Sequence, residues 1–462
     1  MAPKNLTTPA LTTERLSASE RWEAGKALRQ VVPRSAHSQW YPTRERPDPI
    51  DMLEASAQGR IPEMIPIRYG RMLQSPFAFL RGAAMIMAAD LATTPTTSIQ
   101  VQACGDCHLI NFGGFASPER HLIFDLNDFD ETLPATWEWD VKRLVTSIIV
   151  AGRDIRLSDQ DCYEAALAAA RAYRLAMVEY GQMRAMDVWY ARLDAEMLLD
   201  HAPDEETRQL WTRMATRAFS RTLEQAFQQL TQEHDGQRRF IDNPPWIYHL
   251  PNHEQYLQEI ALLFEQYRDS LQHERQFLLD RYHLVDVAMK VVGVGSVGTH
   301  CGVALLLADD EDPLLLQFKE ARASVLEPYA EENIYSSQGE RIVAGQRLMQ
   351  AVSDIFLGWT SNERGQDFYF RQLRDMKSAI KLKGMSVRGL TDYAEICACA
   401  LARAHARTGE PATISGYLGQ SDIFDRAVAD FAATYAHQVE CDYQALVTAV
   451  QSGRIKAQKV EV

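Results

Sequence analysis

Three polar residues in the first third of the chain have the types and spacing that phosphoryl transfer needs. Asp106 lies in the run Cys-Gly-Asp-Cys-His, Asn111 follows five residues later, and Asp125 follows fourteen residues after Asn111. A carboxylate at Asp106 can accept the proton of an attacking hydroxyl, and amide and carboxylate oxygens are the ligands that magnesium prefers. We predict Asp106 as the catalytic base, Asn111 and Asp125 as metal ligands, and Asp128 as a further ligand.

Two other interpretations use the same residues. Acidic residues and Asn-Asp pairs are common in turns, so the cluster alone also suits an ordinary loop. The run from Gly105 to His108 has the form Gly-Asp-x-His, which is also found in dinuclear-metal phosphoesterases. That class needs further histidine ligands downstream, and neither His300 nor His405 stands in a metal-binding motif.

A glycine-rich segment much further along the chain is a candidate for phosphate binding. Gly293, Gly295, Ser296 and Gly298 lie in the segment Gly-Val-Gly-Ser-Val-Gly. A dinucleotide-binding fold would place a helix directly after these glycines. The apolar run 301–308 instead predicts a strand, so we expect a glycine-rich turn between antiparallel strands, as in the hairpin that covers the phosphates in kinases.

Lys319 ends the next apolar run and is the predicted partner of the α- and β-phosphates. Kinases need such a lysine on the third strand of the sheet that carries the glycine-rich turn. Glu340 follows 21 residues later, at the start of a predicted helix, and is expected to pair with Lys319. Glu327, Glu331 and Gln346 are rivals for that role.

These parts together predict an α+β, protein-kinase-like fold with two lobes in permuted chain order. In ordinary kinases the glycine-rich loop and the lysine precede the catalytic loop, whereas here the glycine-rich segment begins 168 residues after Asp125. Geometry, rather than chain order, decides whether catalytic groups meet. We expect a helix-rich large lobe and a small antiparallel-sheet lobe, joined by the strand-like segment 368–373. Gln372 in that segment is assigned to the nucleotide site.

The expected divisions and elements follow from composition and periodicity. Residues 1–60 form an N-terminal extension that is partly irregular, and 61–284 form the catalytic-loop part of the large lobe. Residues 285–375 form the small lobe, and 376–462 form the C-terminal helical part of the large lobe. Strands are expected at 98–104 and 121–125, with three more within 285–321. Helices are expected at 76–91, across much of 139–235, at 254–279 and at 339–357.

Composition narrows the classes of function. The 462 residues are 46% hydrophobic and 24% charged, with a net charge of −14, so a large core is expected and non-specific nucleic-acid binding is disfavoured. The N-terminus lacks the apolar region of a secretory signal, and no apolar run approaches the ~18–20 residues that span a bilayer. We expect a cytoplasmic protein that binds neither nucleic acid nor membrane. Seven cysteines argue against a disulfide scaffold, and the Cys104-x-x-Cys107 pair has no second pair to complete a zinc site.

Blocks over nearly the whole chain resemble the bacterial domain-of-unknown-function 2252 family. These blocks are RYGRMLQSPFAFLRG (68–82), CGDCHLINFGGFASPER (104–120), FDLNDFDETLPATWEWDVKRL (124–144), KVVGVGSVGTHC (290–301), LQFKEARASVL (316–326), GQRLMQAVSDIFLGW (345–359) and ALARAHARTG (400–409). The catalytic block is in turn similar to the aminoglycoside and choline phosphotransferase branch of the protein-kinase-like fold.

That second similarity implies the same roles for Asp106, Asn111 and Asp125. Cys104 stands where the branch has a histidine, which removes a residue that braces the backbone. Asp140 resembles the buried aspartate that braces the catalytic loop from the following helix. Three arginines offer charge for a phosphate or an acidic substrate: Arg68, Arg71 and Arg81. Surface or structural ion pairing is the alternative role for each of them.

The residues and the resemblance together indicate an ATP- and Mg²⁺-dependent phosphotransferase. Its partners would be the nucleotide and an acceptor that carries a hydroxyl, either a small molecule or a protein. Three alternatives stay open: a catalytically inactive nucleotide-binding pseudokinase or scaffold, a nucleotidyl (AMP) transferase, and a dinuclear-metal phosphoesterase, which fits the residues least.

Overall fold

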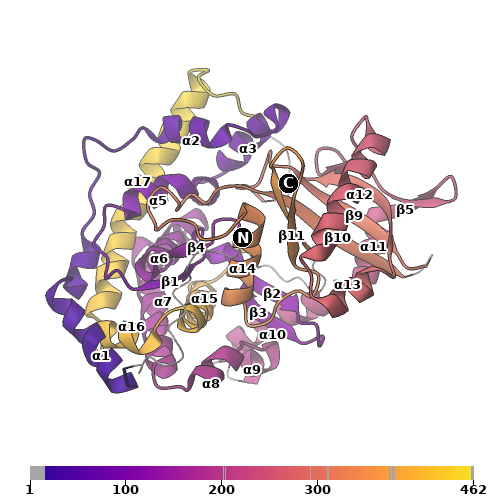
Figure 1. The fold of residues 1–462 in the computed structure, drawn as a ribbon. Coiled ribbons are helices and arrows are strands. Elements are labelled where there is room, and N and C mark those ends of the chain that lie inside the picture. The colour runs from indigo at the N-terminus through magenta and orange to yellow at the C-terminus, as the bar shows by residue number, and fades with distance from the viewer. Residues whose placement is uncertain are drawn as a thin grey trace.

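The computed structural model describes residues 16–458, apart from 201, 203, 292, 310, 311, 374, 375 and 377–379. The fold is α+β (Figure 1). The helices are α1 Ala18–Ala27, α2 Pro49–Ala57, α3 Ile65–Met72, α4 Pro76–Gly82, α5 Ala84–Leu91, α6 Trp137–Asp154, α7 Asp159–Tyr180, α8 Ala185–Tyr190, α9 Ala195–Asp200, α10 Glu205–Phe219, α11 Leu223–Leu230, α12 His253–Asp269, α13 His273–Leu279, α14 Gln338–Met349, α15 Val387–Thr408, α16 Pro411–Leu418 and α17 Ile423–Gln451. The strands are β1 Gln100–Ala103, β2 Phe112–Ala116, β3 Leu122–Leu126, β4 Leu133–Thr136, β5 Thr231–His234, β6 Gln237–Phe240, β7 Ile247–Tyr248, β8 His283–Lys290, β9 Cys301–Leu307, β10 Pro313–Ala321, β11 Gly358–Ser361 and β12 Asp367–Gln372.

A six-stranded antiparallel sheet, in the order β11-β12-β10-β9-β8-β7, lies on one side of the molecule (Figure 1). Alternate side chains of a strand point to opposite faces. In β10, Leu316 and Phe318 pack in a cluster with Tyr267 of α12, while Leu315 packs in another cluster with Phe227 of α11. Both faces are therefore covered, which explains why these strands are almost continuously apolar.

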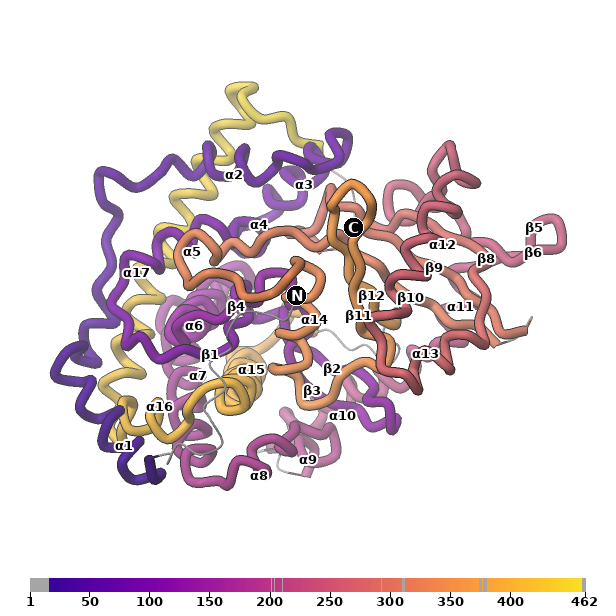
Figure 2. Tube along the Cα trace, in the orientation of Figure 1, coloured from indigo at the N-terminus to yellow at the C-terminus, as the bar shows by residue number. Residues whose placement is uncertain are grey.

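The rest of the molecule is mainly a helical body with its own hydrophobic core. Helix α7 packs against α6, α15 and α17, and its contact with α15 is the most extensive. Small alanines on the buried face of α7, such as Ala166, Ala169 and Ala170, allow this close approach. Figure 2 shows the body beside the sheet, with the β5–β6 hairpin projecting from the sheet side.

The short strand pair β1–β4 positions two polar segments between the sheet and the body. In the antiparallel pair β1–β4, Ala103 at the end of β1 lies opposite Leu133 at the start of β4. The residues that leave β1 and those that enter β4 must therefore lie at the same end of the pair. The register alone brings segment 104–106 next to segment 128–131.

The predicted elements are largely present, with several differences in extent. The strands expected within 285–321 are β8, β9 and β10; β12 covers most of 368–373, and β1 and β3 flank the catalytic-loop segment. The helix expected over 76–91 is divided at Ala83, whose backbone is non-helical, into α4 and α5. The segment 254–279 is likewise divided into α12 and α13, and α14 ends at Met349 rather than near residue 357.

Some strands were not predicted, and two predictions concern residues outside the described ones. Strands β2, β4, β5, β6, β7 and β11 were not predicted, because they are short and their sequences carry no clear alternation of apolar residues. The predicted irregular tail before residue 16 and the predicted lobe boundary at residue 375 lie outside the described residues. Over the part of the chain that the structure describes, no helix combines the length and the apolar character that crossing a bilayer would require.

Candidate active site

Helix α6 holds the backbone of the loop that follows β1. The Asp140 carboxylate accepts hydrogen bonds from the backbone N–H of Cys104 at 2.6 Å and of Gly105 at 3.0 Å. Gly105 has a φ of +81°, and a Cβ there would overlap the Glu131 carbonyl. The bracing contact expected of Asp140 is thus present, and only glycine fits the turn that presents Asp106.

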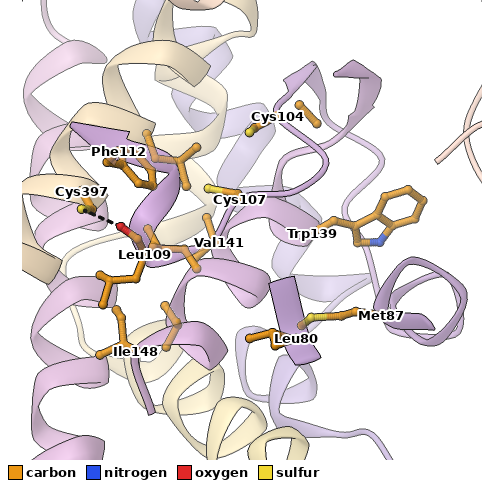
Figure 3. Packing of buried hydrophobic residues seen from close by; sticks show 14 of the residues in the cluster. Leu80, Met87, Cys104, Cys107, Leu109, Phe112, Trp139, Val141, Ile148 and Cys397 are labelled. Carbon is orange, nitrogen blue, oxygen red and sulfur yellow. Dashed lines mark hydrogen bonds between the residues drawn. The ribbon is translucent and has the colours of Figure 1, made fainter. Parts of the chain in front are cut away.

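The same loop rests on a buried apolar layer. Cys104, Cys107, Leu109 and Phe112 belong to the core cluster of the helical body, and Figure 3 shows them beside Val141 of α6. The Cys397 thiol of α15 lies 3.9 Å from the Leu109 carbonyl oxygen. Packing of the apolar residues between the polar ones therefore holds the loop rigidly on the body.

Asp106 is held by an arginine that the sequence analysis missed. Arg143 Nε donates to Asp106 Oδ1 at 2.8 Å, and its Nη2 contacts the same oxygen and the Leu80 carbonyl. The Asp106 side chain is 24% exposed, whereas that of Arg143 is buried, so the arginine orients a carboxylate that solvent or a ligand can reach. Arg143 lies three residues after Asp140 on the same helix, and this spacing was the available signal.

Asn111 and Cys104 connect the loop that contains Asp106 to the segment that contains Asp128. Asn111 Nδ2 donates to the backbone carbonyl of Asp128 at 3.0 Å and to that of Asp106 at 3.2 Å. Cys104 Sγ lies 3.6 Å from the same Asp128 carbonyl. Cys104 thus contacts the backbone that follows β3.

Lys319 connects the six-stranded sheet to the loop between β3 and β4, which contains Asp128 and Asp130. Its Nζ lies 2.9 Å from Asp130 Oδ2 and 3.4 Å from Asp128 Oδ1, and the Tyr369 hydroxyl donates to Asp130 Oδ1 at 2.6 Å. Burial lowers the pKa of Lys319, but the carboxylates of Asp128 and Asp130 more than offset this, and the pKa lies well above its ordinary value. Lys319 therefore stays charged and holds the two carboxylates together.

The glycine-rich segment is the connection between the antiparallel strands β8 and β9, as predicted. Gly293 and Gly298 have φ angles of +60° and +88°, which favour glycine. Arg60 donates to the Gly295 carbonyl at 2.8 Å and to the Val297 carbonyl at 2.7 Å. Arg71 donates to the Gly293 carbonyl, so residues from the helical body hold the connection in place.

A cavity of about 200 Å³ lies between the glycine-rich connection and the loop that contains Asp106. Asp106 and Asp130 line one side, and Gly295 and Ser296 line the other. Four arginines complete the wall: Arg60, Arg68, Arg81 and Arg322. Segments separated by almost two hundred residues therefore meet around one polar cavity.

The arginines of this cavity are crowded and short of carboxylate partners. Arg60 and Arg68 donate to carbonyl and hydroxyl oxygens, and Arg322 donates to the Gln58 carbonyl. Burial and neighbouring arginines lower the pKa of Arg60 to about 9, and chiefly burial lowers that of Arg68 to about 10. Asp106 and Asp130 are already paired with Arg143 and Lys319, and the other two carboxylates of the lining, Glu131 and Glu320, accept from backbone N–H groups. An anion would therefore be favoured beside the arginines.

Asp125 is not among the residues that line this cavity. Its carboxylate is fully buried and accepts from Arg403 Nη2 at 2.7 and 2.8 Å, and from the backbone N–H of Leu126 and Ala351, each at 2.9 Å. These donors occupy both oxygens. The Asp125 carboxylate thus lies in a buried ion pair between β3 and α15, whereas Asp128 and Asp130 are the carboxylates near Lys319.

Glu340 and Gln372 also lie elsewhere. The Glu340 carboxylate accepts from the Ser336 backbone N–H at 3.0 Å at the start of α14, so it caps that helix rather than pairing with Lys319. Gln372 lines a separate cavity with Asp354, whose carboxylate accepts from the Gln372 backbone N–H. The expected lysine–glutamate pair is replaced by the pair of aspartates.

The structural role of Asp125 predicts a large loss of stability on substitution. Changing Asp125 to alanine leaves the buried Arg403 without its counter-charge, which should lower the free energy of unfolding by about 3–5 kcal/mol. Urea denaturation of the variant and of Asp269→Ala, an exposed control, measures the difference. A variant with unchanged stability would show instead that the Asp125–Arg403 pair is dispensable.

Glu131, beside the cavity, predicts a pH-dependent stability. Burial raises its pKa to about 7 from an ordinary 4.5. Between these values the folded protein keeps a proton that the unfolded chain releases, so stability falls as pH rises through this range. Wild type should lose thermal stability relative to Glu131→Gln between about pH 5 and pH 8. Parallel melting curves across this range would contradict the raised pKa.

Comparison with known proteins identifies the family but supplies no characterised relative. No curated protein and no solved structure matches the chain. The model of one family, described as uncharacterized protein conserved in bacteria (DUF2252), matches residues 60–449, which include every residue that lines the cavity from Arg60 onward. The chain belongs to this DUF2252 family.

Proposed function

We propose that the protein is an ATP- and Mg²⁺-dependent phosphotransferase that acts on a hydroxyl group. The observation that carries the proposal is the cavity in which the glycine-rich connection faces Asp106 and Asp130, with Lys319 bound to the loop that contains Asp128. A glycine-rich turn, a strand lysine and carboxylates on an opposing loop are the recurring parts of phosphoryl-transfer sites.

Asp106 is the proposed catalytic base. Arg143 fixes one carboxylate oxygen, and the partly exposed side chain faces the cavity, where an acceptor hydroxyl would donate its proton. A base of this kind lowers the barrier mainly by orienting the nucleophile toward the phosphorus atom. Asp140 acts on the reaction only through the loop backbone, so its role is positioning.

Asp128 and Asp130 are the proposed metal ligands, with Asn111 beside them. The donors are hard oxygens, which suit Mg²⁺, and the Lys319 ammonium that now lies between the carboxylates shows that a positive charge fits there. Mg²⁺ bound at these residues would neutralise charge on the phosphates. Lys319 would then be free to contact the α- and β-phosphates from the sheet side.

The arginines support a polyanionic ligand such as a nucleoside triphosphate. A triphosphate carries several negative charges, and the cavity wall offers Arg60, Arg68, Arg81 and Arg322. Of the four carboxylates in the same wall, Asp106 and Asp130 already pair with Arg143 and Lys319, and Glu131 and Glu320 accept from backbone N–H groups. Backbone N–H groups of a glycine-rich connection commonly cradle phosphate oxygens. Both features favour binding of the nucleotide phosphates between the glycine-rich connection and Asp106.

We further propose that the fold is a two-lobed, kinase-like fold in permuted chain order. The sheet carries the glycine-rich connection and the lysine, as in the small lobe of kinases, while the helical body carries the catalytic loop. On this proposal the predicted small lobe, 285–375, is extended by β7 and by the helices α11 and α12 that cover the sheet, and it is inserted between the two parts of the large lobe.

Two substitutions separate binding from transfer. Lys319→Met should abolish the thermal stabilisation by ATP with Mg²⁺, because the phosphates lose their cationic partner. Asp106→Asn should keep that stabilisation and lower the rate of transfer by about 10²–10⁴-fold, since only the base is lost. Differential scanning fluorimetry measures binding, and transfer of label from γ-³²P-ATP to small-molecule and protein acceptors measures activity. Asp269→Asn is the matched exposed control.

Each alternative gives a different outcome in the same assays. Label transferred from α-³²P-ATP but not from γ-³²P-ATP would show nucleotidyl transfer. Nucleotide binding without transfer to any acceptor would favour an inactive, nucleotide-binding protein. Stabilisation by Mn²⁺ or Zn²⁺ that is independent of nucleotide, together with phosphoester hydrolysis that depends on Asp106 and His108, would favour a dinuclear-metal hydrolase and overturn the proposal.

A further inference from the structure

A second cluster of metal-binding side chains lies at the edge of the six-stranded sheet, apart from the cavity. His249 follows β7, His253 begins α12, and Asp286 lies within β8. Their ligand atoms, two imidazole nitrogens and one carboxylate oxygen, all lie within 4.8 Å of one another. No local pattern in the sequence indicates this cluster, and the proposed phosphotransferase makes no use of it.

The distances within the cluster agree with a common coordination sphere. His249 Nε2 lies 3.1 Å from Asp286 Oδ2, and His253 Nε2 lies 3.2 Å from Asp286 Oδ1. Zinc binds imidazole and carboxylate at about 2.0–2.1 Å in tetrahedral geometry, which separates neighbouring ligand atoms by about 3.3 Å. The two histidines therefore need only small adjustments to bind one ion together with Asp286.

Outer contacts hold the three side chains in this arrangement. His249 Nδ1 lies 2.8 Å from Asp242 Oδ1, so Asp242 turns the Nε2 atom of His249 toward Asp286. The Asp286 carboxylate accepts from the backbone N–H of Phe240 at 2.6 Å and of Val287 at 2.9 Å. A histidine ligand whose second nitrogen contacts a carboxylate is the usual arrangement around protein-bound metals.

The cluster is buried on one side and open on the other. The Asp286 side chain is fully buried, whereas those of His249 and His253 are 18% and 17% exposed. His253 Nδ1 is buried and has no hydrogen-bond partner among the described residues, so hydrogen bonds alone do not satisfy the cluster. An ion could enter from the open side, and water could complete its coordination.

We propose that His249, His253 and Asp286 bind a divalent first-row transition metal, for which Zn²⁺ is the probe. Two imidazoles and one carboxylate favour such an ion over Mg²⁺ and Ca²⁺, which prefer all-oxygen sites. The ion would tie the start of α12 and the end of β7 to β8. It would thereby stabilise the sheet that carries Lys319.

Metal titration of the full-length protein tests this proposal. Tag-free protein is stripped with a chelator, dialysed and titrated with ZnCl₂ by isothermal calorimetry, alongside His253→Ala and Asp242→Asn. The matched control is His283→Ala, because His283 is an exposed histidine at the start of β8. Circular dichroism checks that each variant is folded.

Wild type should bind one zinc ion that His253→Ala loses, while His283→Ala binds as wild type does. Asp242→Asn should weaken binding by about 10–100-fold, because it removes only the orientation of His249. Co²⁺ in place of Zn²⁺ should give visible absorption that the His253 variant lacks. Equal zinc binding by wild type and His253→Ala, or zinc binding no tighter than Mg²⁺ binding, would overturn the proposal. Nucleotide binding is scored separately, so failure of either proposal leaves the other testable.

Discussion

The buried ammonium of Lys319, between Asp128 and Asp130, is the interaction on which the relation between the sheet and the helical body depends. A charge removed from water costs several kcal/mol unless it is paired and hydrogen-bonded. Lys319 is almost completely buried, and its carboxylate partners come from the loop between β3 and β4. Any displacement of the sheet from that loop would leave charges without partners. The ion pair therefore fixes the position of the sheet, and with it that of the glycine-rich connection, relative to Asp106.

On the other side of the cavity, helix α6 fixes the position of the loop that contains Asp106. Its Asp140 binds the backbone of the catalytic loop, and its Arg143 binds the Asp106 side chain. Both residues are buried on one helix, so loop backbone and carboxylate are held relative to each other by a single rigid element. The β1–β4 register then places Asp128 and Asp130 beside them.

Local patterns in the sequence were sufficient to predict the α+β class, the glycine-rich connection and the strand that carries Lys319. Each depends on the alternation of apolar residues or on glycine, which short segments reveal. The partners of charged side chains were harder to predict. Asp125 fits the expected spacing, but its carboxylate pairs with Arg403, which lies on a helix 278 residues later in the chain. Glu340 lies at the right distance along the chain, but it caps its own helix. The His249–His253–Asp286 cluster depends on a strand pairing that no local pattern contains.

A crystal structure with Mg²⁺ and a non-hydrolysable ATP analogue tests the central claim most directly. The account predicts that the phosphates lie between Gly295 and Asp106, with Lys319 contacting the phosphates and Mg²⁺ bound by Asp128 or Asp130. The γ-phosphate should lie close enough to Asp106 for an acceptor hydroxyl to fit between them. Phosphates bound away from this cavity, with the Lys319–Asp130 ion pair unchanged, would contradict the account.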